Sequence, residues 1–365
     1  MDKESGPRSA TIEDVARQAG VSTATVSRTF AGNYPVAEST RLKVTRAATD
    51  LGYIPNAHAQ ALAGSRVRSI GIVLNDLVDP FFAFIARGAE QAASSLGRLS
   101  LIAATGGNAD REIAVTDLLL QQRTNLVILV GGSFSDESYR RKMAARARAL
   151  HGIGSALVLC GRPSLGVDDL TCQIEYDNAD GAAAVTDHLI SRGHERILYL
   201  GGPDGLSTTA ARLEGHRRAL TARGIRPDPG LVEIGSFGRE FGYATLSRRL
   251  ERARDFTAIF AANDIVAEGA YQALREKGLQ VPTDVSIVGY DDVPVARQLS
   301  PGLTTVRIPL EGLGAEAVRI GLAAVDGPKG SARSVQLGTH VILRGSTAER
   351  PGARRRPVTT EEEAP

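Results

Sequence analysis

The stretch VSTATVSRTF, residues 21–30, brings several hydroxyl side chains and one arginine together near the start of the chain. Ser, Thr and Val are mediocre helix formers, so their concentration in one short helix calls for another reason. Hydroxyl groups can donate to phosphates or to base edges, and a guanidinium such as that of Arg28 can engage O6 and N7 of guanine together. The stretch therefore has the chemistry of a nucleic-acid contact, and an ordinary helical hairpin is the alternative.

Three short helices are predicted around this stretch. Thr11 and Asp14 form a capping box at the start of the first helix, and Gly20 ends it. After the turn AGV, a second helix carries the hydroxyl residues as far as Arg28, and the apolar spacing predicts a third helix over 38–51. Two helices joined in this way form a helix-turn-helix, in which the second helix enters the major groove of DNA.

From Ser69 onward, apolar runs alternate with amphipathic helices, as in SIGIVL followed by PFFAFIARGAEQAASSLG. This repeated alternation predicts parallel sheets covered on both faces. Roughly ten strands exceed a comfortable single sheet, so we expect an α/β body of two doubly wound subdomains with a cleft between them. The turn-forming stretch RPSLGVDDL, residues 162–170, is the expected boundary between the two sheets.

The head sequence also matches a known pattern. The stretch TIEDVARQAGVSTATVSRTFAGNYPVAESTRLKVTRAATDLGYIPNAHAQALAGSRVRSIGIVLND closely resembles the head of the lactose-repressor and galactose-repressor (LacI/GalR) family of bacterial transcription regulators. The resemblance continues through DPFF, DN at Asp177, GH at Gly193, RLEG, AAND and VGYDD. It implies an all-α helix-turn-helix head and a periplasmic-binding-protein-like body, with a ligand held at the carboxyl ends of the strands.

The resemblance implies which residues of the head contact DNA. Bases are read at the positions of Thr23, Ala24 and Arg28, and phosphates are contacted at those of Ser22, Thr25 and Ser27. Ala24 has no hydrogen-bonding group and meets at most a thymine methyl. This position departs from relatives that carry a polar residue there, so their operator sequence does not transfer directly.

A second DNA contact is implied for the hinge, residues 55–68, which contains PNAHAQALAGS. The matching segment of the family becomes helical only on operator DNA. His58 and Leu62 are the expected contacts, and Leu62 matches the apolar wedge that is inserted into the minor groove. The alternative is that Leu62 packs in a seam between domains.

For a small ligand, the resemblance implies seven positions around the cleft. These are Pro80, Phe81, Phe82, Arg212, Phe237, Asn263 and Asp291. Carboxylate, guanidinium and amide groups bind hydroxyls, and an aromatic face stacks on C–H patches, so the set suits a sugar. Some of these residues could instead have purely structural roles. One of the adjacent phenylalanines could belong to the core, because neighbours on a helix do not point to one side. Arg212 could form a surface ion pair, and one of the two adjacent aspartates could cap a turn.

Several other functions lack their motifs. The turn LNDLVDPFF has no G-x-G-x-x-G, and Gly201 and Gly202 are not followed by Lys-Ser or Lys-Thr, so no nucleotide-binding loop is predicted. The motifs G-x-S-x-G and H-E-x-x-H are absent, so we expect no catalysis, no bound metal and no cofactor. Cys160 and Cys172 are expected to be reduced, partly buried thiols.

Composition agrees with a globular DNA-binding protein. The 365 residues are 42% hydrophobic and 23% charged, with a net charge of +2. Residues 1–69 hold 9 Lys and Arg against 6 Asp and Glu, which gives a basic head on a nearly neutral body. No signal peptide and no apolar run of membrane-spanning length are evident, so we expect a cytoplasmic protein.

These observations and the resemblance predict a homodimeric transcription regulator, most often a repressor in this family, whose affinity for a palindromic operator is changed by a small-molecule effector, a mono- or oligosaccharide. The tail lacks a Leu heptad, which favours a dimer over a tetramer. The rival interpretations are a purine or nucleoside effector, a solute-binding protein and an enzyme with a similar body. The predicted organisation is a disordered tail (1–10), a helix-turn-helix domain (11–54), a hinge (55–68), an effector-binding and dimerisation domain of two interleaved subdomains (69–347) and a disordered tail (348–365).

Overall fold

The computed structural model describes most of the chain. The described residues are 10–31, 34–53, 69–134, 136–252, 254–327 and 334–350. The predicted hinge over residues 55–68, with His58 and Leu62, lies outside them, as do residues 1–9 and 351–365 of the predicted tails.

The described part of the head consists of three helices. These are α1 (Ile12–Ala19), α2 (Thr23–Ala31) and α3 (Glu38–Asp50). The predicted capping box is present: the Thr11 hydroxyl accepts from the Asp14 amide, and the Asp14 carboxylate accepts from the Thr11 amide at 3.0 Å. Gly20 ends α1 with a left-handed φ of 66°. The three helices bury a small common core made of Val15, Ala16, Val26, Val44, Ala47 and Ala48. Helix α2 continues past Arg28, where the sequence pattern predicted its end.

The N-terminal subdomain of the body is built on a parallel six-stranded sheet in the order β11-β5-β4-β3-β1-β2. Its strands are β1 (Ser69–Leu74), β2 (Leu99–Ala104), β3 (Leu126–Val130), β4 (Ala156–Cys160), β5 (Thr171–Tyr176) and β11 (Ser334–Leu337). Its helices are α5 (Pro80–Ser95), α6 (Ala109–Gln121), α7 (Glu137–Gly152) and α13 (Leu310–Asp326). Helices α5 and α13 cover one face and α6 and α7 the other, which explains why the central strands are apolar throughout.

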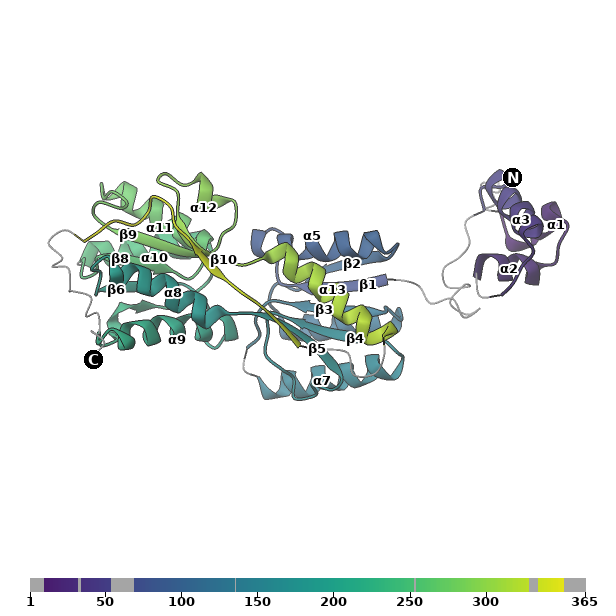
Figure 1. Cartoon of the computed structure of the whole chain (residues 1–365), viewed down its shortest axis with the longest axis horizontal. Helices are drawn as coiled ribbons and strands as arrows, with labels where there is room; N and C mark the ends of the chain where they lie inside the picture. Colours follow the sequence, from purple (N-terminus) through teal and green to yellow (C-terminus); the bar gives the residue numbers. More distant parts are fainter. Residues whose placement is uncertain are drawn as a thin grey trace, which may run out of the picture.

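The C-terminal subdomain repeats this arrangement, with the order β12-β10-β9-β8-β6-β7 (Figure 1). Its strands are β6 (Ile197–Leu200), β7 (Val232–Glu233), β8 (Ala258–Ala261), β9 (Ser286–Asp291), β10 (Thr304–Arg307) and β12 (His340–Ile342). Its helices are α8 (Asn178–Ser191), α9 (Ser207–Ala222), α10 (Arg239–Arg252), α11 (Asp264–Glu276) and α12 (Val295–Gln298), with a 3-10 turn, η1 (Pro229–Leu231). Only β12 runs antiparallel to its neighbour. The expected pair of doubly wound subdomains is therefore confirmed.

The predicted boundary between the sheets was wrong. Strand β5 follows residues 162–170 and still pairs with β4 in the first sheet, so the chain leaves that subdomain only after Tyr176. The turn formers mislead because β4 and β5 are joined by a loop without a helix, and Leu165 and Val167 of that loop are buried in the core beneath α6 and α7. The chain then crosses between the subdomains twice more, before α13 and after β11.

The body continues three residues into the predicted C-terminal tail. The amide of Ala348 donates to the Ser286 hydroxyl at 3.1 Å, and the amide of Arg350 donates to the carbonyl of Arg192 at 2.9 Å. These bonds attach the chain to the C-terminal subdomain as far as Arg350. No helix within the described ranges is long and apolar enough to span a bilayer.

Candidate functional site

A cavity of about 750 Å³ lies between the two subdomains, where the strands of both sheets end. Six predicted ligand residues line it: Phe81, Phe82, Arg212, Phe237, Asn263 and Asp291. Pro80, the first residue of α5, is not among the lining residues. Side chains separated by more than 200 positions in the sequence therefore meet around one space.

The two phenylalanines reach the cavity from the start of α5. The carboxylate of Asp79 caps this helix by accepting from the Phe81 amide at 2.9 Å, and Pro80 occupies the first helical position. The rings of Phe81 and Phe82 stand edge to face with centroids 5.0 Å apart. Both side chains border the cavity, and Phe81 is at the same time buried in the hydrophobic core, as the alternative of a core role allowed.

Arg212 is buried and crosses the base of the cavity. Its Nη2 lies 2.8 Å from Oδ1 of Asp291, its Nε donates to Oδ1 of Asn178 at 2.9 Å, and its Nη1 donates to the carbonyl of Ala262. Its guanidinium also lies over the ring of Tyr290 at 3.8 Å. The alternative of a surface ion pair is excluded, because the Arg212 and Asp291 side chains are only 2% and 5% exposed.

The adjacent aspartates at the end of β9 have separate partners. Asp291 lines the cavity, whereas Asp292 binds Nε of Arg307 at 2.6 Å and Nη2 of Arg344. Both have positive φ values, 104° and 56°, a conformation that is unfavourable for residues other than glycine. Burial raises the pKa of Asp291 to about 7; the charge of Arg212 opposes this shift and that of Asp79 adds to it.

Asn263 combines a structural bond with a position on the cavity wall. Its Oδ1 caps α11 by accepting from the Val266 amide at 2.8 Å, and its Nδ2 donates to the carbonyl of Phe237 at 3.3 Å. The amide thus links α11 to the segment that carries Phe237. A side-chain amide has two N–H donors and two acceptor lone pairs, so one of each is free of these bonds and can serve a ligand.

The second helix of the head presents the predicted polar surface. Ser22, Thr23, Ala24 and Arg28 are exposed, and Thr25 and Ser27 are half-buried. Val26, in the same helix, is fully buried in the head core. The Ser22 hydroxyl caps the helix by accepting from the Thr25 amide at 3.2 Å, and the Arg28 guanidinium lies 5.5 Å from the centre of the Tyr34 ring. One face therefore holds the helix in the core of the head, and the other, which carries the residues expected to contact DNA, is exposed.

Comparisons with known proteins agree with this arrangement of head and cavity. The model of bacterial regulatory proteins of the LacI family matches residues 11–56, and that of the periplasmic binding protein-like domain matches residues 186–347. The HTH-type transcriptional regulator GalR of Escherichia coli is 36% identical over 317 residues, which cover 87% of this chain and 90% of GalR. This chain belongs to the LacI family.

Further LacI-family relatives match over nearly the whole length. CelR of Thermobifida fusca is 34% identical over 93% of this chain and 98% of its own. The crystal structure of the lac repressor dimer bound to operator and the anti-inducer ONPF has a TM-score of 0.81 at 28% identity, and the match covers 93% of this chain and 100% of that one. A CelR–cellobiose complex has a TM-score of 0.68 at 33% identity, with 92% and 99% covered.

Sequence reasoning missed other residues around the cavity of this LacI-family protein. They include Asn75, Asp76, Asp79, Arg111, Phe134, Tyr176, Thr208 and Ser236. Ligands of doubly wound sheets bind beyond the carboxyl ends of strands, so the residues directly after each predicted strand were a usable signal. That rule would have found Asn75 and Asp76, directly after β1, but not Tyr176, because β5 was not among the predicted strands. Arg111 and Thr208 lie within helices, where no comparable signal exists.

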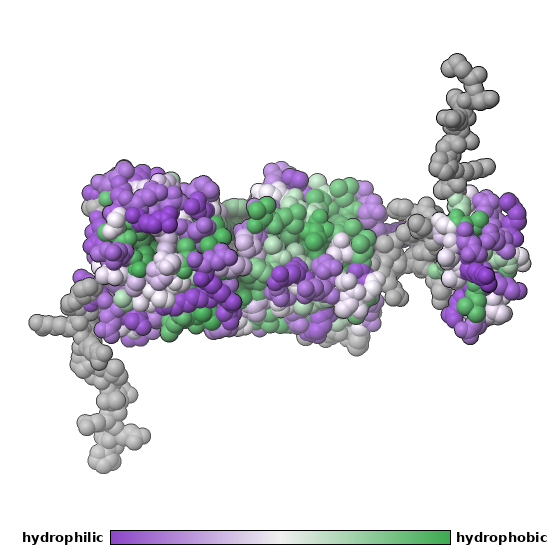
Figure 2. All heavy atoms as spheres, turned by 90° about the horizontal axis from the view of Figure 1, so that it is seen from above, coloured by the Kyte–Doolittle hydropathy of each residue, from purple (hydrophilic) through white to green (hydrophobic). Residues whose placement is uncertain are grey.

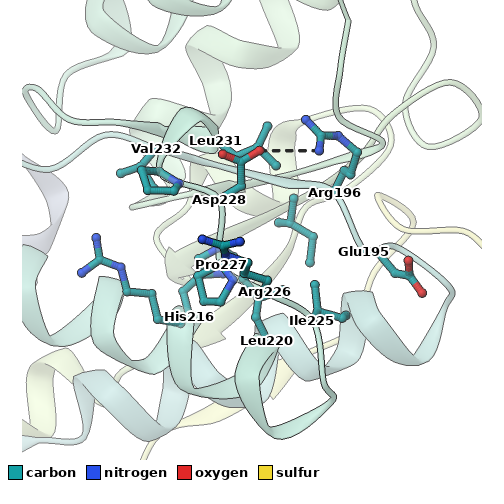
Figure 3. Close-up of a pocket in the computed structure, with 13 residues that line it drawn as sticks. Glu195, Arg196, His216, Leu220, Ile225, Arg226, Pro227, Asp228, Leu231 and Val232 are labelled. Atoms are coloured by element: carbon teal, nitrogen blue, oxygen red, sulfur yellow. Dashed lines mark ion pairs between the residues drawn. The ribbon is translucent and has the colours of Figure 1, made fainter.

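A second, smaller hollow of about 180 Å³ lies within the C-terminal subdomain (Figure 3). At its rim Asp228 faces Arg196 at 3.5 Å, and His216 lies in its wall. The Nδ1 of His216 is bonded to the Thr186 hydroxyl at 3.0 Å, and burial lowers the pKa of this histidine to about 4. None of the predicted ligand residues borders this hollow, and its one buried ionisable group, His216, is neutral at physiological pH.

The described residues offer no obvious metal centre. No three His, Cys, Asp or Glu side chains in the described ranges gather in a way that would hold a metal ion. Cys160 and Cys172 are buried thiols, and burial raises the pKa of Cys160 to about 12, which makes it a poor nucleophile. The two cysteines are thiols as predicted, but they are fully rather than partly buried.

Proposed function

We propose that this protein is a sequence-specific DNA-binding transcription repressor whose operator affinity is changed by a small-molecule effector, a sugar. It acts as a homodimer on a palindromic operator, in the cytoplasm, and carries out no catalysis. The proposal rests on two features that occur together in one LacI-family chain. Helix α2 has an exposed polar face, and the cavity is lined by buried Arg212, which has N–H donors that form no hydrogen bond to described residues.

On the DNA side, α2 supplies both kinds of contact. Ser22, Thr25 and Ser27 would bind phosphates and fix the position of the helix, while Thr23, Ala24 and Arg28 would face the bases. Arg28 is the strongest candidate for base recognition because its side chain is exposed and has no hydrogen-bond partner in the described head. His58 and Leu62 of the hinge would add a minor-groove contact at the operator centre.

On the ligand side, the cavity suits an uncharged molecule with several hydroxyls. The carboxylate of Asp291 already balances Arg212, so a ligand charge is not required. Arg212, Asn263 and Asp291 retain hydrogen-bonding capacity, and Phe81, Phe82 and Phe237 offer apolar surface for the C–H faces of a sugar ring. The related CelR structure is a complex with cellobiose, which supports a sugar here. The same aromatic side chains would stack on a purine, so nucleosides are the second ligand class.

Exposed apolar side chains support a homodimer formed through the N-terminal subdomain. Figure 2 shows a broad apolar area over this part of the molecule. The exposed large apolar side chains of this subdomain include Leu77, Val78, Leu96, Leu99, Ile102 and Leu118. A contiguous apolar surface of this kind marks an interface, and a two-fold dimer presents two copies of α2 to the half-sites of a palindrome. Light scattering on the full chain would test the dimer.

The proposal is tested by selecting DNA from a random duplex library with the full-length protein. We expect enrichment of a palindrome, and we expect Arg28→Ala to weaken binding to it by roughly tenfold or more, which is the range for losing one bidentate base contact. Arg223→Ala, directly after α9 in the C-terminal subdomain, is the control and should bind normally. Selection that enriches no palindrome would refute the DNA-binding half.

The effector half is tested on the selected operator by fluorescence anisotropy. Cellobiose, other mono- and disaccharides and nucleosides are added in turn, and one of them should change operator affinity at least several-fold. A compound that binds tightly in the cavity and leaves operator affinity unchanged would contradict allosteric control.

A further inference from the structure

A short loop of the N-terminal subdomain is bonded directly to the C-terminal subdomain beside the cavity. The amide of Ser207 donates to the carbonyl of Ser133 at 3.0 Å, and the amide of Ser133 donates to the Ser207 hydroxyl at 3.1 Å. Next to this pair, Phe134 and Leu206 form an isolated antiparallel bridge. These contacts are separate from the three covalent crossings that join the subdomains.

The contact supplies the N-terminal cap that α9 lacks. Leu206 occupies the cap position and its side chain makes no cap hydrogen bond. The first amides of a helix have no partner within the helix, and a buried one must find a partner elsewhere. The carbonyl of Ser133, from the other subdomain, takes this role for the Ser207 amide. Separation of the two subdomains would leave this end of α9 without its partner.

Glycines allow the close approach. A Cβ on Gly132 would lie 2.5 Å from Oγ1 of Thr208 and 3.0 Å from Oγ of Ser207, both on α9. The first distance is shorter than a real Cβ contact, so a side chain at this position would force the hydroxyls of α9 or the loop itself to move, whereas glycine lets the loop lie directly on α9. Alanine at position 132 would therefore act as a wedge between the subdomains.

The loop is held firmly within its own subdomain. Nε of Arg162 donates to the carbonyl of Gly131 at 2.9 Å, and its Nη2 donates to that of Val130 at 3.1 Å. Arg162 is buried and paired with Glu112 at 2.8 Å. Because its base is fixed in this way, the loop moves with the whole N-terminal subdomain, and its contact with α9 reports how the two subdomains are placed.

We propose that residues 131–134 form a latch that holds the two subdomains closed over the cavity by docking on the N-terminus of α9. Ser133 and Ser207 are positioning residues: they need not touch the ligand, and they set the distance between the walls that do. Gly131, Gly132 and Phe134 on one side, with Leu206 and Thr208 on the other, all line the cavity. The role of the latch in effector response rests on the proposed function, but the closure itself does not.

The test measures closure without ligand or DNA. Spin labels on Arg148→Cys in α7 and Glu214→Cys in α9, both exposed, report the distance between the subdomains of the full-length protein by electron paramagnetic resonance. The labelled protein is mixed with an excess of unlabelled parent, so that each proposed dimer carries labels on one protomer only. Cys160 and Cys172 are buried and are not expected to label. We expect one narrow distance distribution for the parent, a largely shifted one for Gly132→Ala, and a mixture of both for Ser207→Ala, which leaves the Ser133 amide without its acceptor.

Ser207→Thr is the matched control, because it keeps the hydroxyl and should restore the parent distribution. Thermal unfolding of each variant shows whether it is folded. If Gly132→Ala fails to fold, Ser207→Ala still tests the latch, because it removes only one hydroxyl from a half-buried side chain. Equal distance distributions for the parent and Ser207→Ala, or for the parent and a folded Gly132→Ala, would overturn the latch. Because no effector is added, these results are independent of whether the cavity binds a sugar.

Discussion

Within the described ranges, each subdomain contains one arginine–carboxylate pair in which both side chains are buried. Arg162 and Glu112 lie 2.8 Å apart in the N-terminal subdomain, and Arg212 and Asp291 lie 2.8 Å apart in the C-terminal subdomain. Both arginine side chains are 2% exposed. Yet Arg162 uses all five of its N–H donors, on Glu112, Tyr139 and two backbone carbonyls. Arg212 makes only three such bonds to described residues, and it borders the cavity.

The carboxylates differ in the same way. Burial alone would raise the pKa of Glu112, but the charge of Arg162 and hydrogen bonds from Arg162 and Tyr139 outweigh burial and place it below its ordinary value. Asp291 receives one bond from Arg212 and faces the charge of Asp79, so burial wins and its pKa rises to about 7. A fully satisfied pair stabilises a fold, whereas an incompletely satisfied pair beside a cavity has interactions left for a ligand.

The largest effect is expected from breaking the satisfied pair. Arg162→Met removes five hydrogen bonds and leaves Glu112 buried without a counter-charge, so the free energy of unfolding should fall by about 3–5 kcal/mol. Urea denaturation measures it. The double variant Arg162→Met/Glu112→Leu should recover much of the loss, because it leaves no unpaired charge. If the double variant is no more stable than the single one, the pair does not act as a unit.

The next effect concerns ligand binding. Arg212→Met should weaken binding of the effector found by the anisotropy screen by roughly 10- to 100-fold, which corresponds to losing one or two hydrogen bonds from a charged donor. Isothermal titration calorimetry measures it. Arg218→Met, an exposed arginine on the same helix, is the control and should bind normally. Unchanged affinity in Arg212→Met would mean that the spare donors do not meet the ligand.

The two pairs also show what the sequence can and cannot predict. Arg212 and Asp291 stand in RLEG and VGYDD, short motifs that the family resemblance carries, and local rules placed the capping box at Thr11 and the alternation of strands and helices. Arg162 and Glu112 are 50 residues apart, belong to no motif, and meet only because the order of the strands brings α6 beside the end of β4. Arg162 even fell inside the stretch that was wrongly predicted to separate the sheets.

A smaller effect on the free energy of unfolding is expected when the pH is changed, and its sign is opposite for the two pairs. The lowered pKa of Glu112 contributes stability above the ordinary pKa of a glutamate, and this contribution is lost as pH falls through the folded value. The raised pKa of Asp291 contributes stability at low pH that is lost as pH rises through about 7. Asp291→Asn should therefore become more stable relative to the parent between about pH 5 and about pH 8.

Over the same interval the difference between Glu112→Gln and the parent should stay nearly constant, because Glu112 is ionised throughout. Urea denaturation at both pH values measures the two differences. If the difference in free energy of unfolding between Asp291→Asn and the parent did not change with pH, Asp291 would be ionised beside Arg212 across the whole range. The two carboxylates would then not differ in their pH dependence.

The smallest effect is expected from a third pair with the same chemistry on the surface. Arg223 binds both oxygens of Asp187, with Nε at 2.8 Å and Nη2 at 3.0 Å, but the side chains are 52% and 44% exposed. Water solvates both charges when the pair is broken, so Arg223→Met should lower the free energy of unfolding by less than about 1 kcal/mol, and added salt should shrink the difference. Urea denaturation measures the change. If the free energy of unfolding fell as much as in Arg162→Met, geometry alone, rather than burial with complete hydrogen bonding, would set the strength of these pairs.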